Sequence, residues 1–371
     1  MINALQICSY YSSNFYKLLF KELSQFDINS TVYYFAENGT QPGHLTPDVK
    51  FSECYGSFDR LFFKKKEDKV LQAYDALGLG SNFDIAHAHS LFANGYIAYK
   101  LKKRYGIPYV VAVRNTDVNV FFKYMPWLRK LGLDIMEEAS HIVFISPSYK
   151  SAVFETYVPN KLKAELLDKT DVIPNGINSL FTSQRPPKYV EKQNDVINLI
   201  QVGDVCRNKN QAGVIAACRD LEKAGYQVKY HVVGKVIEPK IGKMLAKKGA
   251  MLNPVVSQVD LIDFYRSSDV FIMPSYTETF GLSYIEAMSQ GLPVIFSIGQ
   301  GIDGYFEKDT VGFAVNPSSP KSIAEGIIKA YNSRVSMRNT CIDKARDFDW
   351  KKIAGNYHRI YSSVLASEAK W

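Results

Sequence analysis

The sequence predicts an α/β chain with two domains, each built on a parallel sheet, and three observations support this class. The chain has 371 residues, which exceeds the usual size of a domain built around a single hydrophobic core, so two domains are expected. Apolar residues make up 46% and charged residues 22% of the chain, an ordinary globular composition. In each half, short apolar runs alternate with segments of helical periodicity, which is typical of βαβ units covered by helices on both faces.

The N-terminal half alternates strands and helices from its first residues. The apolar run at residues 4–9 is typical of a buried strand, and apolar residues at helical spacing over 15–26 predict the helix that follows. The alternation then continues with expected strands at 85–89, 109–113 and 142–145 and an expected helix at 91–105.

A change of texture around Asn175 indicates the domain boundary, because IPNGINSLFTSQRPPKYVEKQND is rich in turn formers and charge. Beyond it the alternation restarts, and the chain ends in one amphipathic helix over DWKKIAGNYHRIYSSVLAS, whose apolar residues recur at helical spacing. The expected strands of this half are 197–202, 228–233, 270–273 and 294–296, and the expected helices are 211–223, 240–248 and one from Leu282 to Gln290.

Charge and cysteine usage restrict the class of partner and the compartment. The formal net charge of +8 favours an anionic partner: nucleic acid, an anionic membrane surface or a phosphorylated small molecule. The five cysteines show no CxxC spacing, which argues against a disulfide framework or a zinc knuckle and fits a reducing cytoplasm. No signal peptide and no window of about 18 apolar residues is found, so we expect any membrane contact to be peripheral.

The stretch TETFGLSYIEAMSQGLPVI places Glu278 and Glu286 on either side of a Phe-Gly-Leu turn that opens a helix. The N–H groups of Phe280, Gly281 and Leu282, together with the helix dipole, form an anion site suited to phosphate. Carboxylates are good acceptors for sugar hydroxyls, so the pattern predicts a phosphate held between two sugars. The alternative is that one glutamate stabilises the helix N-terminus and the other is a solvated surface charge.

These residues resemble the E-x7-E signature of the retaining glycosyltransferases of family 4, and the resemblance runs along nearly the whole chain. It implies the GT-B fold: two Rossmann-like domains facing a cleft, with a C-terminal helix that crosses back to the N-terminal domain. The supporting segments are FDIAHAHS, GIPYVVAVRNTDVN, DVIPNGI, QVGDVCRNKN, HVVGK, SSDVFIMPS and DGYFEKDTVGFAV. The implied domains are residues 1–178 with 352–371 for the acceptor and 190–351 for the nucleotide sugar, with residues 179–189 as a linker.

The resemblance also implies residue roles on the donor side. Glu286 would bind the nucleotide ribose, and Glu278 the hydroxyls of the transferred sugar. Gly203 would lie in the phosphate loop, and Lys209 would neutralise the departing diphosphate. A lysine, an arginine and a helix N-terminus can stabilise that charge without a metal, so we expect no metal and no cofactor besides a UDP- or GDP-sugar substrate.

Three positions depart from the family pattern. Asp204 stands where relatives commonly have an arginine, so Arg207 is the candidate substitute. Ser12-Ser13-Asn14 replaces a Gly-Gly pair, which makes Ser13 a candidate acceptor contact. The third departure is VRNTD, which reads Arg-Asn where many relatives have His-Gly.

The VRNTD segment supplies candidates for the reaction centre. Arg114 can contact donor or acceptor, but it cannot act as a neutral hydrogen-bond acceptor at pH 7. Asn115 and Asp117 are candidate acceptor or sugar contacts. His89 is the other candidate, and the choice between that role and a structural one stays open, whereas His87 is more typical of a structural residue.

Two segments of the N-terminal half, RLFFKKKEDK and FFKYMPWLRKLG, combine aromatic or aliphatic residues with lysine and arginine. This mixture suits the headgroup region of an anionic bilayer, which favours a lipid-linked acceptor at the inner face of the cell membrane. A core helix with solvated lysines is the alternative. Signatures of nucleic-acid binding are absent from the sequence.

Among members of the family, the VRNTD variant and the size of this chain resemble enzymes that build bacterial surface polysaccharides on a polyprenyl carrier, and a soluble sugar or metabolite is the alternative acceptor. The expected function is a retaining, metal-independent glycosyltransferase that moves a hexosyl residue from a nucleotide-diphosphate sugar to an oligosaccharide acceptor, which we expect to be lipid-linked. Two alternatives remain: a nucleotide-sugar epimerase or phosphorylase of the same fold, and a catalytically silent protein that binds a nucleotide sugar or nucleic acid.

Overall fold

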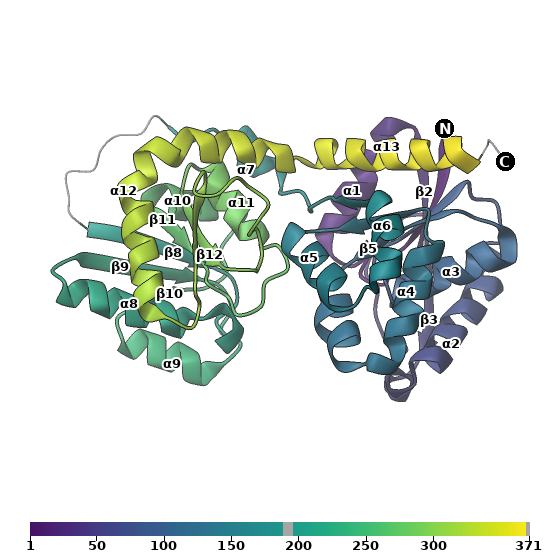
Figure 1. The fold of residues 1–371 in the computed structure, drawn as a ribbon, viewed down its shortest axis with the longest axis horizontal. Helices are drawn as coiled ribbons and strands as arrows, with labels where there is room; N and C mark the ends of the chain where they lie inside the picture. Colours follow the sequence, from purple (N-terminus) through teal and green to yellow (C-terminus); the bar gives the residue numbers. More distant parts are fainter. Residues whose placement is uncertain (188–195, 369–371) are drawn as a thin grey trace. The chain divides into compact units, whose positions relative to one another are not determined.

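The computed structural model describes residues 1–187 and 196–368, and the chain divides into two compact units (Figure 1). The N-terminal unit comprises Met1–Ile145, Tyr149–Asn175 and Trp350–Trp371. The C-terminal unit comprises Ser146–Ser148 and Gly176–Asp349. Each unit contains one parallel sheet, as the alternation of strands and helices predicts.

The sheet of the N-terminal unit has seven strands in the order β3-β2-β1-β4-β5-β6-β7, and every pairing is parallel. Its strands are β1 (Ile2–Ile7), β2 (Ile28–Glu37), β3 (Val49–Tyr55), β4 (Ile85–Ala88), β5 (Tyr109–Val113), β6 (His141–Phe144) and β7 (Thr170–Val172). Its helices are α1 (Asn14–Leu23), η1 (Ser24–Phe26), η2 (Ser57–Leu61), α2 (Phe63–Ala76), α3 (Ala93–Tyr105), η3 (Asp117–Phe122), η4 (Pro126–Leu128), α4 (Arg129–Glu138), α6 (Asn160–Asp168) and α13 (Trp350–Glu368); α5 (Pro147–Thr156) begins at the unit boundary.

The sheet of the C-terminal unit has six strands in the order β10-β9-β8-β11-β12-β13, again all parallel. Its strands are β8 (Val196–Val202), β9 (Gln227–Val233), β10 (Met251–Asn253), β11 (Val270–Ile272), β12 (Val294–Ser297) and β13 (Gly312–Val315). Its helices are α7 (Ser179–Ser183), η5 (Arg207–Lys209), α8 (Gln211–Lys223), α9 (Pro239–Lys247), α10 (Gln258–Ser267), α11 (Leu282–Ser289), α12 (Pro320–Ala345) and η6 (Arg346–Phe348).

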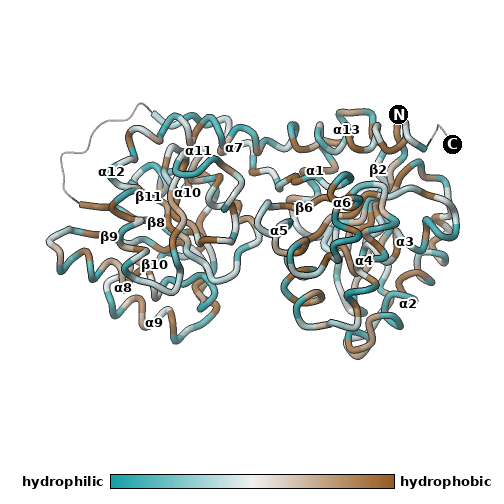
Figure 2. Tube along the Cα trace, viewed as in Figure 1, coloured by the Kyte–Doolittle hydropathy of each residue, from teal (hydrophilic) through white to brown (hydrophobic). Residues whose placement is uncertain are grey.

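Side chains of β1 enter two different cores, which shows that the N-terminal sheet is covered on both faces. Leu5 and Ile7 belong to the cluster that also contains residues of α2 and α3, whereas Ala4 belongs to the cluster that contains residues of α1 and α13. Successive side chains of a strand point to opposite faces, so a sheet buried on both faces needs apolar residues in continuous runs. Figure 2 shows these hydrophobic segments gathered inside each unit.

The last helix, α13, packs on the N-terminal unit. Its apolar face, from Trp350 to Val364, lies in the same cluster as Tyr16, Leu19 and Phe20 of α1. The predicted amphipathic helix is confirmed, and so is its return to the first domain.

The predicted linker, residues 179–189, is partly wrong. Ser179–Ser183 form α7, and the ring of Phe181, 1% exposed, packs against Tyr265 of α10. A helix this short shows no periodicity in the sequence. The turn-forming residues around it therefore led to the prediction of a linker. The division between the units falls after Asn175 and after Asp349, a few residues before the expected 178 and 351. Residues 188 and 189 of the linker and 190–195 of the expected second domain lie outside the described residues.

Within the described part of the chain, no helix combines the length and the apolar composition that crossing a bilayer requires.

We expect Ile353→Ala to lower the free energy of unfolding of the N-terminal unit by about 2–5 kcal/mol, because it opens a cavity under α13 at a side chain that is 1% exposed. Ser362→Ala, at an exposed position of the same helix, is the matched control and should change this free energy by less than about 0.5 kcal/mol. Denaturant titration followed by circular dichroism measures both. Equal midpoints for the two variants would show that α13 contributes little to the unit.

Candidate functional site

The candidate donor residues lie on loops that leave the carboxyl ends of two adjacent strands of the C-terminal unit. β8 and β11 are paired in the sheet. The loop after β8 leads through Gly203 into η5, and the loop after β11 leads through residues 277–281 into α11. In open parallel sheets the crevice outside the carboxyl ends of the strands is the usual place for a ligand.

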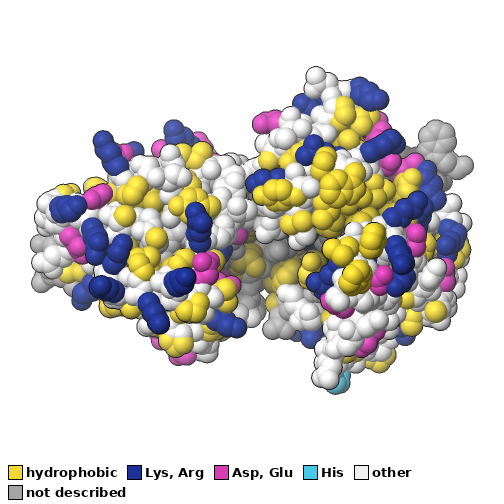
Figure 3. Space-filling view, turned by 90° about the horizontal axis from the view of Figure 1, so that it is seen from below, with side chains coloured by type: hydrophobic (Ala, Val, Ile, Leu, Met, Phe, Trp, Pro, Cys, Tyr) yellow, Lys and Arg dark blue, Asp and Glu magenta, His cyan; other side chains and the backbone are white. Residues whose placement is uncertain are grey.

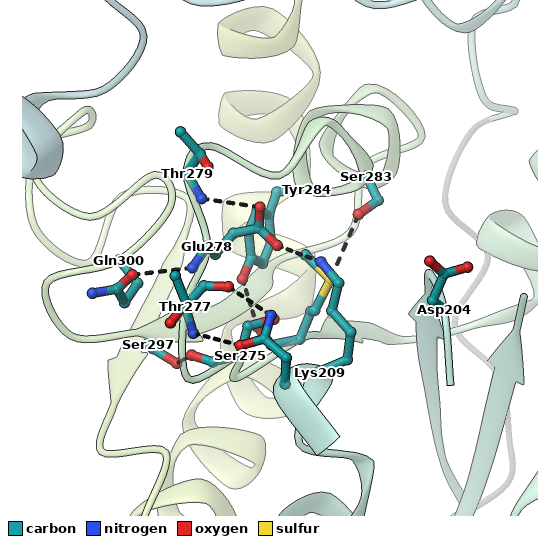
Figure 4. A network of polar contacts seen from close by, with 12 residues as sticks. Asp204, Lys209, Ser275, Thr277, Glu278, Thr279, Ser283, Tyr284, Ser297 and Gln300 are labelled. Atoms are coloured by element: carbon teal, nitrogen blue, oxygen red, sulfur yellow. Dashed lines mark hydrogen bonds and ion pairs between the residues drawn. The ribbon is translucent and has the colours of Figure 1, made fainter. Parts of the chain in front are cut away.

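Lys209 and Glu278 connect these two loops (Figure 4). The Lys209 Nζ atom lies 2.5 Å from Glu278 Oε2, and the two side chains are 22% and 13% exposed. The other carboxylate oxygen, Oε1, accepts a hydrogen bond from the Thr279 N–H at 3.1 Å. The backbone N–H of Glu278 donates to the Gln300 side chain at 3.0 Å. The two residues that the sequence assigned to phosphate and sugar are therefore in direct contact.

Two asparagines hold the Lys209 turn in place. The Asn208 side chain accepts a hydrogen bond from the Thr277 N–H at 3.1 Å and donates one to the Thr277 carbonyl at 2.9 Å. Asn210 has φ of +55° and accepts a hydrogen bond from the Gly213 N–H as N-cap of α8. Its amide also donates to the carbonyls of Pro274 and Pro317. Lys209 thus projects from a turn that is bonded on both sides.

The turn at Gly281 requires glycine. Its φ is +82°, and a Cβ atom there would lie 2.5 Å from the ring of Tyr284. Gly281 is the N-cap of α11, whose first N–H groups have no acceptor inside the helix. Phe280 is 3% exposed and packs on Phe348, so its ring supports the turn and only its backbone N–H is suited to a ligand. Leu282 is the first residue of the helix.

Glu286 lies inside α11, where its Oε2 atom accepts a hydrogen bond from the Tyr265 hydroxyl at 3.2 Å. Burial raises the pKa of Glu286 to about 7, and the hydrogen bond from Tyr265 opposes the shift. Both the neutral and the ionised form are therefore populated near neutral pH. This removes the alternative of a fully solvated surface charge.

The structure places Arg207 and Asp204 differently from Lys209. Arg207 is exposed, and its backbone N–H donates to Glu238 Oε1 at 2.8 Å. Asp204 is exposed and lies apart from the Lys209 and Glu278 side chains (Figure 4). Gly203 has φ of +144° and lies close to the Lys209 side chain, since an added Cβ would be 3.7 Å from its Cε atom.

The N-terminal unit contains a pocket of about 610 Å³ at the carboxyl ends of its strands, which we call the acceptor-side pocket. Its lining residues come from the carboxyl ends of β2 and β3, from the loops after β1, β4 and β5, and from η2, α2, α3, η3 and η4. They are Ser9, Tyr10, Tyr34, Phe35, Ala36, Glu37, Thr40, Tyr55, Arg60, Leu61, Phe63, Lys66, Ser90, Ala93, Arg114, Thr116, Asp117, Val120, Phe121, Met125, Trp127 and Leu128.

Arg114 and Asp117 both line this pocket. Arg114 is hydrogen-bonded to an amide side chain, and Asp117 is hydrogen-bonded to backbone N–H groups. An Arg114 NH1 group donates to Asn175 Oδ1 at 3.0 Å, while its Nε atom is buried without a partner among the described residues. The Asp117 carboxylate accepts hydrogen bonds from the N–H groups of Leu91, Phe92 and Arg114. Burial raises the pKa of Asp117 to about 6, and these N–H groups oppose the shift. Asp117 therefore organises the loop that presents Arg114.

His89 is a core residue and does not line the pocket. Its side chain is fully buried, its Nε2 atom lies 2.9 Å from Gln6 Oε1, and its ring is 4.0 Å from that of His87. His87 Nδ1 in turn lies 2.7 Å from the Tyr361 hydroxyl of α13. Burial lowers the pKa of both histidines well below the usual value, so both are neutral. The structure favours the structural reading of His89 that the sequence left open.

The remaining two candidates lie outside the lining of the pocket. Ser13 is the N-cap residue of α1, and its side chain makes no capping hydrogen bond. Asn115 is exposed, and its Oδ1 atom accepts a hydrogen bond from Asn119 at 2.6 Å. Neither contact decides whether these residues bind a ligand.

Sequence reasoning did not single out Asn208, Tyr265 or Gln300, although each contacts a candidate residue or its loop. Asn208 could have been found, because it adjoins Lys209 within RNKN. Tyr265 and Gln300 could not, since they contact Glu286 and Glu278 only through the fold. Among the described residues, no group of three or more His, Cys, Asp or Glu side chains is arranged to hold a metal ion.

Comparison with known proteins gives two family matches that together span most of the chain. Residues 14–179 match the model described as Glycosyltransferase Family 4, and residues 184–348 match the model described as Glycosyl transferases group 1.

Two named proteins and one solved structure are among those similar to this chain. An alpha-monoglucosyldiacylglycerol synthase from Acholeplasma laidlawii is 25% identical over 63% of this chain and 63% of its own length. A Bacillus subtilis (strain 168) glycosyltransferase named for teichuronic acid biosynthesis, TuaC, is 25% identical over 76% of this chain and 71% of its own. Among solved structures, sucrose-phosphate synthase from Thermosynechococcus elongatus superposes with a TM-score of 0.76 at 17% identity, covering 99% of this chain and all of that one. That last likeness shows the fold.

Because ribose hydroxyls bind best to an ionised carboxylate, we expect nucleoside diphosphate affinity to rise up to about tenfold between about pH 6 and pH 8, as Glu286 with a pKa of about 7 loses its proton. Isothermal titration calorimetry with UDP and GDP measures this. The phosphates of the ligand can also titrate in this pH range, and Glu286→Gln retains only their contribution. The affinity of this variant should therefore change less between pH 6 and pH 8. Tyr265→Phe removes the hydrogen bond that favours the ionised form, so it should move the rise to higher pH. A profile that Glu286→Gln leaves unchanged would contradict the role of this carboxylate.

Proposed function

Since the chain belongs to glycosyltransferase family 4 and has the GT-B fold, we propose that it transfers a hexosyl residue from a nucleotide-diphosphate sugar to a lipid-linked oligosaccharide, with retention and without a metal ion. The coarser assignment is a glycosyltransferase of glycolipid or polysaccharide synthesis. The contact between Lys209 and Glu278 is the observation that carries the proposal. It joins the lysine proposed to bind the diphosphate to the carboxylate proposed to bind the sugar.

On the donor side, the leaving group is a nucleoside diphosphate whose negative charge grows as the glycosyl bond breaks. Lys209 and the N–H groups around Gly281 would stabilise that charge, which is worth most where donors are fixed and water is scarce. The paired Glu278 carboxylate would exchange Lys209 for sugar hydroxyls when the donor binds, so lysine and carboxylate each gain a new partner. Glu286 would hold the ribose.

The chemical step would be a same-face substitution through an oxocarbenium-like transition state. The acceptor hydroxyl attacks the anomeric carbon on the side from which the diphosphate departs, and the departing phosphate oxygen takes the hydroxyl proton. No protein carboxylate then has to act as nucleophile, which fits a Glu278 that is already held by Lys209 and the Thr279 N–H.

On the acceptor side, we assign the 610 Å³ pocket of the N-terminal unit to the lipid-linked saccharide. Arg114 lies in its lining and remains charged at any physiological pH, so it can bind a phosphate or an acceptor oxygen. The relatives named for glucosyldiacylglycerol and teichuronic acid synthesis support an acceptor of glycolipid or polysaccharide chemistry. The proposed place of action is the cytoplasmic face of the cell membrane, with peripheral attachment.

A panel of nucleotide sugars tests this function. We expect one UDP- or GDP-sugar to be hydrolysed slowly, to be transferred when a lipid-linked acceptor is present, and to keep its anomeric configuration in the product by NMR. Saturating EDTA should leave the rate unchanged. Interconversion of the sugar without release of nucleotide would indicate an epimerase, and binding without any turnover would indicate a silent binding protein.

Variants of the ion pair test the assignment of the two residues. We expect Lys209→Met to lower kcat by about 10²–10³-fold, because the cation for the leaving diphosphate is lost. Glu278→Gln should lower turnover as well through lost sugar contacts. Each single variant leaves a partly buried charge unpaired, so the double variant Lys209→Met/Glu278→Gln should recover thermal stability but not activity. Lys229→Met, at an exposed lysine of the same unit, is the control. Full activity in Glu278→Gln would exclude its role.

A further inference from the structure

The acceptor-side pocket has an apolar wall. Its lining includes Phe63, Phe121, Met125 and Leu128, which come from α2, η3, the residue before η4 and η4 itself. Phe63 and Phe121 pack edge to face with ring centres 5.5 Å apart. Ligand pockets of this size are usually lined by apolar side chains with a few placed polar groups. The side chains of these four residues carry no hydrogen-bond donor, so this wall is suited to hydrocarbon.

Two basic side chains of the lining, Arg60 and Lys66, already have acidic partners. Arg60 NH2 lies 2.6 Å from Glu37 Oε2, and both residues line the pocket. Lys66 Nζ lies 2.7 Å from Glu67 Oε1 and 4.6 Å from the centre of the Tyr55 ring. A hydrocarbon chain along the wall would therefore not meet an uncompensated charge at these positions.

Two strongly exposed apolar side chains belong to the lining of the pocket. Leu61 and Trp127 line the pocket and yet are 73% and 72% exposed. Phe58, Phe62 and Tyr124, their neighbours in sequence, are 78%, 59% and 63% exposed. We call these five residues the apolar rim. Figure 3 shows a broad hydrophobic patch on this unit with lysine and arginine side chains at its border.

Basic residues accompany the apolar rim along the chain. Lys64 and Lys65 follow Phe62, and Lys123 precedes Tyr124, and all three are exposed. Large aromatic side chains in water are costly unless something covers them, and lysines beside them favour an anionic cover. An anionic bilayer supplies both the apolar interior and the negative surface.

We propose that the apolar wall of the pocket holds the hydrocarbon chain of the acceptor lipid itself, and that the apolar rim is buried in an anionic bilayer so that this lipid enters from the membrane. The inference rests on the proposed glycosyltransferase function and specifies its acceptor class: the lipid is recognised by its chain and not only by the saccharide that it carries. Arg114, in the lining of the same pocket, lies where the polar end of such a lipid would be bound.

Binding of farnesyl phosphate, a short prenyl lipid that dissolves below its micelle concentration, tests the pocket by isothermal titration calorimetry. We expect saturable binding of this probe and none of inorganic phosphate or maltose at the same concentration. Val120→Phe fills the pocket from a position that is 39% exposed and should therefore fold, and it should weaken binding about tenfold or more. Leu167→Ser, at a leucine 42% exposed on α6 and outside the lining, should bind as the unaltered protein does.

Cosedimentation with phosphatidylglycerol vesicles tests the rim. The double variant Leu61→Ser/Trp127→Ser should lower the bound fraction at a given lipid concentration about tenfold or more, and Leu167→Ser should not. The proposal is overturned if farnesyl phosphate does not bind saturably, if Val120→Phe binds it as tightly as Leu167→Ser, or if maltose binds in its place. A concentration-dependent dimer that the double variant abolishes would assign the rim to a second copy of the chain and would also overturn it.

Donor hydrolysis without acceptor, measured on the same variants, separates this inference from the proposed function. Nucleotide-sugar hydrolysis with no binding of farnesyl phosphate would refute only the lipid pocket. Binding of farnesyl phosphate with no hydrolysis or transfer of any donor would refute the glycosyltransferase and leave a lipid-binding protein.

Discussion

Every strand pairing in both sheets is parallel, and the positions of both candidate sites follow from this constraint. Parallel strands need a crossover between them, so all their carboxyl ends reach one edge of the sheet, and the loops there are free of short hairpin turns. In the C-terminal unit that edge collects the loops after β8, β11 and β12, which carry Lys209, Glu278 and Gln300. In the N-terminal unit it collects the segments after β1 to β5 that form the 610 Å³ pocket.

The loops that carry the candidate donor residues are held in place by contacts with one another. Lys209 is paired with Glu278, Asn208 is bonded to Thr277, and the backbone of Glu278 is bonded to Gln300. A site whose loops are fixed by such contacts loses little conformational freedom when it binds a ligand. If these residues bind phosphate and sugar as proposed, the lysine and the carboxylate have to separate when the donor binds, and both side chains are partly exposed.

The N-terminal unit uses buried polar groups to attach its last helix and to shape its loops. Tyr361 of α13 reaches His87, and His89 reaches Gln6 in the middle of the sheet. Because these groups are almost fully buried, each of their hydrogen bonds matters more than it would at the surface. Asp117 is used in a similar way: it gathers three backbone N–H groups and so fixes the turn in which arginine replaces the more common histidine. Both charged residues of VRNTD line the pocket, and Asp117 also shapes the loop that carries Arg114.

The sequence by itself determined the fold class and the order of most strands and helices, because these depend on local patterns, and its family resemblance supplied the candidate donor residues. Apolar runs and helical spacing identified β5 over 109–113 and α8 over 211–223 with their observed bounds, and E-x7-E with its glycine identified the turn at Gly281.

Only the tertiary structure decided which residues meet. Tyr265 reaches Glu286, Lys209 reaches Glu278, and Leu61 reaches the same pocket as Trp127 across long stretches of chain, and contacts of that separation leave no periodicity in a sequence. The same reason explains His89, whose burial depends on residues from β1, α1 and the neighbouring histidine, whereas its own surroundings in the sequence were compatible with a ligand contact.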